Sequence, residues 1–227
     1  MYLMFILPAM ALSMWASFRT KSAFNKYSEV RSGRGLSGAE AARIMLDREG
    51  LHNVKIERAN GFLSDHYNPL TRSLALSEGV YDSRSIAAIG VATHEAGHAV
   101  QHARNYAPMW LRSTLVPTAN IGSSVGYMVM LGGLMLQASN MVLIGAVLFS
   151  MVLLFQIVTL PVEFDASARA KRLAVEYGLV TASERQGVDR VLNAAALTYV
   201  AAAFSTLLTL LYFLMRSGLL GGRRDND

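Results

Sequence analysis

Hydrophobic and polar positions divide this chain into long uncharged runs and charged segments. Residues 1–18, 113–162 and 191–215 contain no Asp, Glu, Lys or Arg. The middle run has 50 residues, far more than a core helix of ordinary length, whereas one membrane span needs about 20 apolar residues. This run therefore predicts two spans, at 115–136 and 141–160, joined by a tight turn at the polar cluster Gln137-Ala138-Ser139-Asn140.

The two outer runs predict one span each. Residues 191–215 are rich in Ala and Leu and contain no helix-breaking Pro or Gly. Residues 1–18 could form a cleaved signal peptide, but the basic residues Arg19, Lys21 and Lys26 follow where a small-residue cleavage site is expected. A signal anchor is the better interpretation. The sequence thus predicts a mainly α integral membrane protein with four transmembrane helices.

The polar segment between the first two spans predicts a small α+β unit. Ser37 and Glu40 have the spacing of a capping box, which opens a helix that ends near Arg48. The other elements expected here are a strand around Val54 and Ile56, a strand at 73–77, and a helix from about 82–85 to about 104.

These elements give a predicted organisation for the whole chain. It comprises a transmembrane helix at 1–18, the α+β unit at 19–112, two transmembrane helices within 113–160, a cytoplasmic helix at 161–190, a transmembrane helix at 191–215 and a tail at 216–227.

The charges predict how the protein lies in the membrane. Of the 21 Lys and Arg residues, 13 lie between the first and second spans and five lie at 162–190, so the positive-inside rule places both polar segments in the cytoplasm of a cell-membrane protein. Four spans then put the C-terminus outside, although Arg216, Arg223 and Arg224 favour the inside. The net charge of +5 is spread along the polar segments, which indicates orientation in a lipid bilayer and no nucleic-acid partner.

One helix of the α+β unit carries the candidate chemistry. His94-Glu95-Ala96-Gly97-His98 is an H-E-x-x-H motif, in which two histidines one helical turn apart can bind one Zn²⁺. Glu95 is placed to act as general base on a water that the metal activates. Since the chain has no Cys, thiolate metal sites and a cysteine nucleophile are excluded.

A catalytic zinc site requires a third protein ligand, and Glu163 is the strongest candidate for it. Glu163 is the first acid after the 50 uncharged residues, and it is predicted to lie on the same side of the membrane as His94. The alternative is that Glu163 and Asp165 only cap a helix that begins there. Asp165 could orient a ligand histidine from outside the ligand set, or could itself be the ligand.

The sequence resembles the YugP-type zinc-dependent membrane peptidases, which are neutral zinc metallopeptidases, over nearly its whole length. The blocks that carry the resemblance are Asp65-His66-Tyr67-Asn68-Pro69 and residues 89–101, 115–122, 160–167 and 194–203. The layout is also similar to that of HtpX-like metalloproteases, in which two spans separate the H-E-x-x-H helix from a glutamate ligand. Those enzymes carry an acid four residues after that glutamate, whereas here Ser167 holds this position and the acid is Asp165.

The resemblance implies a zinc endopeptidase with a zincin-like catalytic unit at the membrane surface and one Zn²⁺ per chain. Its substrate would be a peptide or a membrane protein, and the strand near 74–77 could bind it by strand addition. A non-proteolytic scaffold with a structural zinc is the alternative function, in which His66 or His102 supplies a fourth ligand. An ion transporter is disfavoured because the second to fourth spans contain no Asp, Glu, Lys, Arg or His.

Three further side chains are open to more than one interpretation. His66 could donate to the oxyanion of a tetrahedral intermediate or hydrogen-bond within a turn, and the turn is favoured. Tyr199 in the fourth span could face the site or contact a neighbouring helix. His102 is expected to contact a neighbouring helix or to support a ligand.

Overall fold

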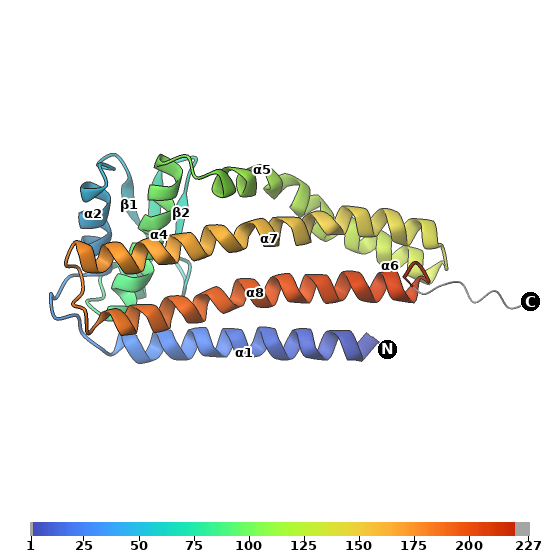
Figure 1. Ribbon diagram of the computed structural model, residues 1–227, viewed down its shortest axis with the longest axis horizontal. Helices are drawn as coiled ribbons and strands as arrows, with labels where there is room; N and C mark the ends of the chain where they lie inside the picture. The colour runs from blue at the N-terminus through green and yellow to red at the C-terminus, as the bar shows by residue number, and fades with distance from the viewer. Residues whose placement is uncertain (1, 221–227) are drawn as a thin grey trace, which may run out of the picture. The chain divides into compact units, whose positions relative to one another are not determined.

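A computed structural model describes residues 2–220, which form a mainly helical fold with one small sheet (Figure 1). The helices and strands, in chain order, are α1 (Tyr2–Ser28), α2 (Gly38–Arg48), β1 (Lys55–Ala59), β2 (His66–Asn68), β3 (Ser73–Ser77), α3 (Glu78–Tyr81), α4 (Ile86–Ala103), α5 (Ala107–Ile121), a π-helical stretch η1 (Gly122–Gly126), α6 (Tyr127–Met135), α7 (Ser139–Glu176) and α8 (Arg185–Arg216).

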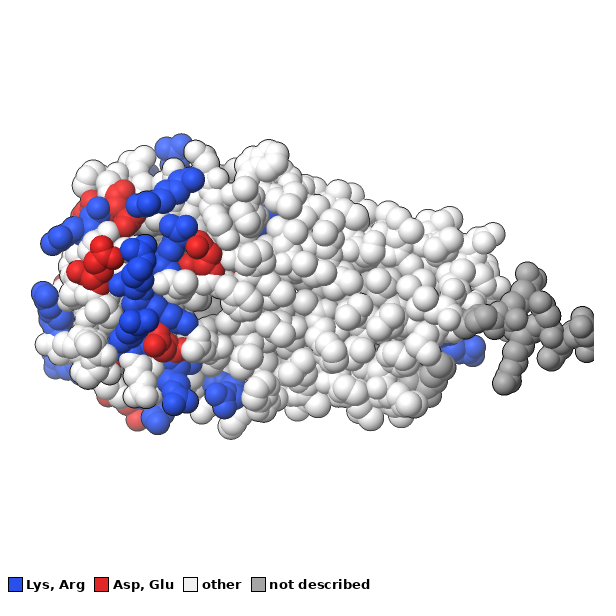
Figure 2. All heavy atoms as spheres, viewed as in Figure 1, with Lys and Arg blue, Asp and Glu red and all other residues white. Residues whose placement is uncertain are grey.

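The chain divides into two compact units that differ in their surfaces. The first contains Met1–Trp15, Leu111–Leu160 and Tyr199–Asp227, and the second contains Ala16–Trp110 and Pro161–Thr198. Among the described residues of the first unit, Arg112 and Arg216 are the only charged side chains. All other charged residues of the described chain belong to the second unit, and Figure 2 shows those on one face gathered over its elements.

The second unit contains the predicted α+β elements. Both halves of the capping box form, since Ser37 Oγ accepts from the Glu40 amide and Glu40 Oε2 accepts from the Ser37 amide. The helix that follows ends at Arg48, as predicted. Its apolar side packs with α4 around a core that includes Met45, Leu46 and Ile89.

The sheet has a strand order that corrects one expectation. The order is β1-β3-β2, with β3 parallel to β1 and antiparallel to β2. The expectation that the strand near 74–77 adds a substrate strand was wrong, because β3 is central and its backbone is hydrogen-bonded on both sides. The free edges belong to β1 and β2.

Two helices extend beyond their predicted ends. The first continues through Ser28 instead of ending at residue 18, since the polar residues after Phe18 include no Pro or Gly and Lys26 lies favourably near the helix C-terminus. The third predicted span continues through Pro161 to Glu176. Glu163 therefore lies inside a long helix. The alternative that Glu163 and Asp165 only cap the start of a helix was wrong.

The first unit contains the apolar helices. Among the described residues, three helices are long and apolar enough to cross a membrane: Leu3–Ser28, Ser139–Glu176 and Arg185–Arg216. Few of their apolar side chains in this unit are buried, and several are exposed, such as Met4, Ile144 and Val147, as expected of surfaces that contact lipid. The predicted span at 115–136 is helical, but it consists of three consecutive pieces, α5, η1 and α6, and it stays a prediction as a fourth span.

Glycines bring α6 into close contact with α7. The predicted turn forms at residues 136–138, with Gln137 at a φ of 55°. A Cβ atom added to Gly133 would lie 2.7 Å from the Val142 amide nitrogen, whereas one added to Gly132 would have a single neighbour, the Met141 side chain at 4.0 Å. Of these two glycines, only Gly133 is therefore required for this packing.

We expect Gly133→Ala and Gly132→Ala to change stability in opposite directions. Gly133→Ala should lower the free energy of unfolding by about 1–3 kcal/mol, because the methyl group forces the two helices apart. Gly132→Ala should raise it by up to about 1 kcal/mol, because alanine favours a helix more than glycine does. Unfolding of the purified protein in detergent measures both, and equal effects would contradict the close contact of α6 with α7.

Candidate metal centre

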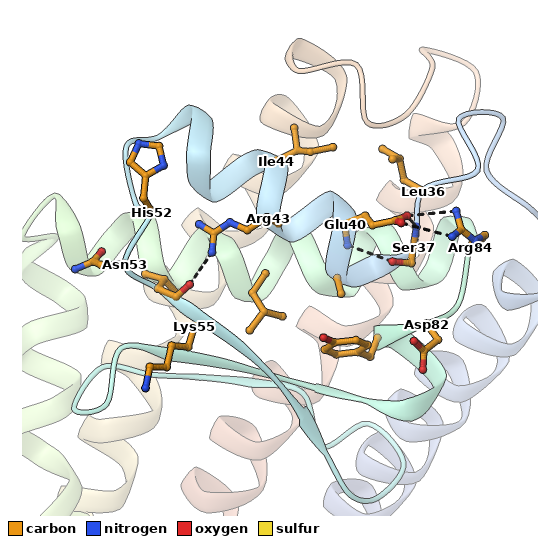
Figure 3. Close-up of a pocket in the computed structure, with 14 residues that line it drawn as sticks. Leu36, Ser37, Glu40, Arg43, Ile44, His52, Asn53, Lys55, Asp82 and Arg84 are labelled. Carbon is orange, nitrogen blue, oxygen red and sulfur yellow. Dashed lines mark hydrogen bonds and ion pairs between the residues drawn. The ribbon is translucent and has the colours of Figure 1, made fainter.

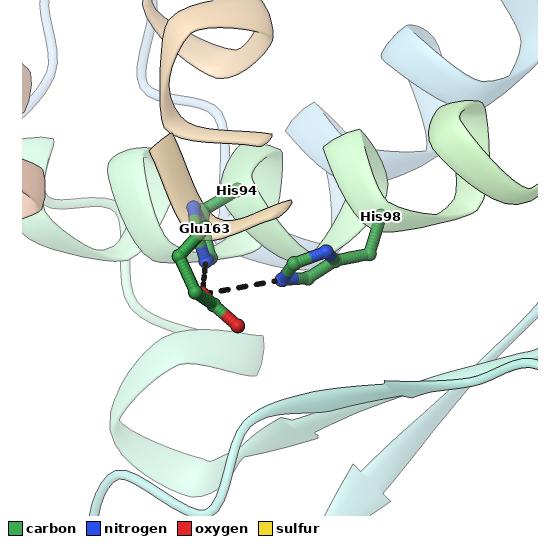
Figure 4. A group of neighbouring side chains, drawn as sticks. All are labelled: His94, His98 and Glu163. Atoms are coloured by element: carbon green, nitrogen blue, oxygen red, sulfur yellow. Dashed lines mark ion pairs between the residues drawn. The ribbon is translucent and has the colours of Figure 1, made fainter. Parts of the chain in front are cut away.

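The two histidines of the H-E-x-x-H motif lie on the predicted helix. Its N-cap is Ser85, whose Oγ accepts a hydrogen bond from the Ala88 amide at 3.2 Å. A second helix contributes to the same place: Glu163 of α7 directs Oε2 to within 3.3 Å of His94 Nε2 and 3.6 Å of His98 Nε2 (Figure 4). One potential ligand atom from each of these three side chains lies within 4.8 Å of the others.

The three side chains form a donor set that fits zinc. Two imidazole nitrogens and one carboxylate oxygen match a catalytic zinc site with three protein ligands. Glu163 and His98 are almost completely buried, at 2% and 6% exposure. A buried carboxylate next to two imidazoles requires a compensating positive charge, which protons or a metal ion can provide.

Hydrogen bonds to the second ring nitrogens orient both histidines. The Nδ1 atom of His98 donates to Gln101 Oε1 at 3.0 Å, and Nδ1 of His94 hydrogen-bonds with Ser167 Oγ at 3.1 Å. Because an amide oxygen only accepts, Nδ1 of His98 carries a proton, and its Nε2 lone pair is directed toward the metal position.

Gln101 connects the two helices that supply the three potential ligands. It is fully buried, and its Nε2 donates to the Val162 carbonyl and to Asp165 Oδ2, both at 2.8 Å. Asp165 also accepts from Arg169 Nε at 2.6 Å. The carboxylate of Asp165 thus reaches His98 only through Gln101, and it lies outside the group of three potential ligands.

The electrostatics of the site favour a positive charge. Burial lowers the pKa of His98, but its hydrogen bond to Glu163 and the charges of Glu95 and Glu163 outweigh this effect and raise the pKa above its usual value. Glu95 is itself buried, at 9% exposure. Its negative charge contributes to the raised pKa of His98.

The other histidines make contacts elsewhere. His66 is exposed on β2, and its Nδ1 donates to the Ser64 carbonyl at 2.8 Å, which is the local contact that was favoured. His102 Nδ1 hydrogen-bonds with the Tyr67 hydroxyl at 2.9 Å. Neither belongs to the group of potential ligands. Tyr199 lies in α8, half-buried.

Gly97 is a site residue that sequence reasoning missed. A Cβ atom at this position would lie 2.8 Å from the carbonyl oxygen of Ala166, so only glycine lets α7 approach α4 closely enough to bring Glu163 to the histidines. A glycine in a helix interior costs about 1 kcal/mol relative to alanine and usually has a packing reason. This stability cost of an interior glycine was the feature of the sequence that could have identified Gly97.

We expect Gly97→Ala to weaken zinc binding by about tenfold or more, since outer contacts of a metal site typically contribute 10–100-fold in affinity. The added methyl group pushes α7, and Glu163 with it, away from α4. Gly90→Ala on the same helix is the matched control, because its Cβ would lie at an ordinary 3.5 Å from Val188. Zinc titration of the metal-free variants measures the difference, and equal affinities would show that Gly97 does not position the ligands.

Comparisons with known proteins show the family of this chain. Residues 2–218 match the family described as "Putative neutral zinc metallopeptidase". The chain is 47% identical over 226 residues, covering 100% of both chains, to the "Putative membrane protease YugP" of Bacillus subtilis (strain 168). No solved structure matches.

Proposed function

Because the chain belongs to this neutral zinc metallopeptidase family, we propose that it is a membrane-embedded zinc endopeptidase. The observation that carries the proposal is the convergence of His94, His98 and Glu163 from two helices on one position. In this proposal they hold one zinc ion per chain and leave a coordination position open, as catalytic zinc sites do.

The proposed reaction is hydrolysis of a peptide bond. A bound zinc ion supplies Lewis-acid chemistry, which acidifies water and polarises the scissile carbonyl. Glu95 acts as general base: its carboxylate takes a proton from the attacking water and then delivers that proton to the leaving amine. Gln101 and Ser167 hold the imidazole rings in place through their Nδ1 atoms, and burial of the site excludes bulk water.

We propose that β2 holds the substrate. It is an edge strand, so the backbone groups on its outer side are free to pair with an extended peptide. It also lies against α4, the helix that carries both histidines. Backbone pairing of this kind selects extended chains with little regard to sequence, which suits unfolded peptides or membrane-protein segments.

We further propose four membrane crossings, the fourth formed by α5, η1 and α6. These three pieces are consecutive from residue 107 to residue 135, and residues 113–135 are uncharged. The distribution of basic residues then places the catalytic unit on the cytoplasmic side. Arg223 and Arg224, which bear on the side of the C-terminus, lie outside the described residues.

A structural zinc site receives no support from the contacts. Such a site needs a fourth protein ligand. The side chains suggested for this role, His66 and His102, hydrogen-bond to Ser64 and Tyr67 and lie outside the ligand group of the described chain.

Removal and restoration of zinc tests the proposed function. We expect the detergent-purified protein to contain one zinc per chain and to cleave an unfolded, fluorescently labelled polypeptide. Chelation should lower cleavage more than about 100-fold, since metal activation of water supplies several kcal/mol of the catalysis, and added zinc should restore it. One bound zinc without any cleavage would favour the scaffold, and cleavage that survives chelation would contradict the metal mechanism.

A further inference from the structure

A polar cavity of about 290 Å³ lies at the C-terminal end of α4. The helix, the loop before β1, the strand β2 and the residue before β3 form its walls. The lining residues are Leu51, Asn53, Val54, Tyr67, Arg72, Ala99, His102, Ala103 and Asn105. The proposed reaction uses none of them.

The polar groups of this cavity are suited to bind an anion. None of its nine lining residues is an Asp or Glu. Arg72 contributes a positive charge with several N–H donors, and Asn53 and Asn105 contribute amide donors. A carboxylate is the common anion of peptides, and guanidinium groups bind it through paired hydrogen bonds.

A larger cleft of about 940 Å³ between α2 and β1 is not lined in a way that favours anions (Figure 3). Glu40 and Asp82 line it together with basic residues. Arg84 pairs with Glu40, and Arg43 donates to the Val54 carbonyl at 2.7 Å. Since its charges are of both signs and several are already paired, this cleft shows no preference for an anion.

The contact between Tyr67 and His102 supplies a further donor to the smaller cavity. Burial raises the pKa of the Tyr67 hydroxyl, although the Arg72 charge opposes the rise, so the hydroxyl keeps its proton and can donate it to His102 Nδ1. A neutral imidazole that accepts at Nδ1 carries its own proton on Nε2. In this tautomer His102 offers an N–H donor.

We propose that this cavity binds a carboxylate of the peptide substrate and so makes the enzyme selective for substrates with a negative charge near the cleaved bond. The inference rests on the proposed function. His102 lies one helical turn beyond His98, about 6 Å along the helix axis, which an extended peptide covers in about two residues. The carboxylate can belong to the C-terminus of the substrate or to an Asp or Glu side chain.

Binding of a small carboxylate tests the cavity without any cleavage. N-acetylglycine is titrated into the zinc-loaded protein at constant ionic strength, with uncharged N-acetylglycinamide as the comparison. We expect only the acid to bind, and Arg72→Asn to weaken it by about tenfold or more, because a hydrogen bond to a charged group is lost. Asparagine suits this position, where φ is 51°, since it tolerates positive φ.

Lys55→Asn is the matched control. It also removes one positive charge, but Lys55 lines the larger cleft and not this cavity. Its affinity for N-acetylglycine should equal that of the wild type. If N-acetylglycine binds the wild type and Arg72→Asn equally well, it is bound at the metal, and the proposal is overturned. Equal losses of affinity in Arg72→Asn and Lys55→Asn would also overturn it.

Cleavage of matched peptides distinguishes the two sources of the carboxylate. A lower KM for a free C-terminus than for its amide identifies the terminal carboxylate, and a lower KM for an internal Glu than for Gln identifies a side chain. Either preference supports the proposal if Arg72→Asn removes it, and no preference in either pair overturns it. If no peptide is cleaved but N-acetylglycine still binds through Arg72, the proposed peptidase fails while the carboxylate site remains.

Discussion

Replacing Glu95 by glutamine is expected to leave one zinc ion per chain and to lower kcat by about 10²–10⁴-fold, the usual contribution of a general acid–base residue. Glutamine has nearly the shape of glutamate, but its amide cannot take a proton from water at neutral pH. Glu95 lies outside the group of three potential ligands, so the metal should remain. Metal analysis and cleavage rates of the same samples measure both effects.

A control for this variant must remove another buried carboxylate of the same unit. Glu49→Gln does so, because its side chain is 6% exposed and accepts hydrogen bonds from Tyr177 Oη and from Arg104. We expect it to lower stability through the weakened contacts while kcat stays close to that of the wild type. A Glu95→Gln variant that cleaves as fast as the wild type would exclude Glu95 as the general base.

The local elements of the second unit follow from short sequence patterns. Ser37 with Glu40 fixes the start of α2, and the turn-prone Asn68-Pro69 pointed to the strand at 73–77 that β3 forms, so both elements were predicted correctly. The strand order was not predictable in this way, because hydrogen bonding between strands depends on contacts distant in the chain. The free edge for a substrate was therefore first assigned to β3, which is central.

The metal centre shows the same division between local and distant information. The spacing of His94 and His98 places both on one helix face, and the first acid after the uncharged run pointed to Glu163. The contacts of Gln101 with Val162 and Asp165 join residues more than 60 positions apart, and no periodicity encodes them. Gly97 was visible only as an unexplained glycine inside a helix, since its reason is the Ala166 backbone on another helix.

Glu163→Ala is expected to lose zinc, whereas Asp165→Ala retains it. Removal of Glu163 leaves two neutral imidazoles, and the affinity should fall by more than the 10–100-fold typical of outer contacts. Without Asp165, Gln101 keeps its hydrogen bonds to His98 and to the Val162 carbonyl, so the loss should stay at or below about tenfold. Zinc titration of metal-free protein, with cleavage measured on the same preparations, gives the two affinities.

Comparison of the zinc affinities of Glu163→Ala and Asp165→Ala decides whether Glu163 is a direct ligand. Both residues are carboxylates on α7, two positions apart, so the two variants remove the same charge from nearly the same place. A general electrostatic effect would weaken zinc binding similarly in both. A direct ligand instead requires a much larger loss for Glu163, whose Oε2 faces both Nε2 atoms. Zinc that stays bound at one ion per chain in Glu163→Ala would move the third ligand elsewhere and return the structural scaffold to consideration.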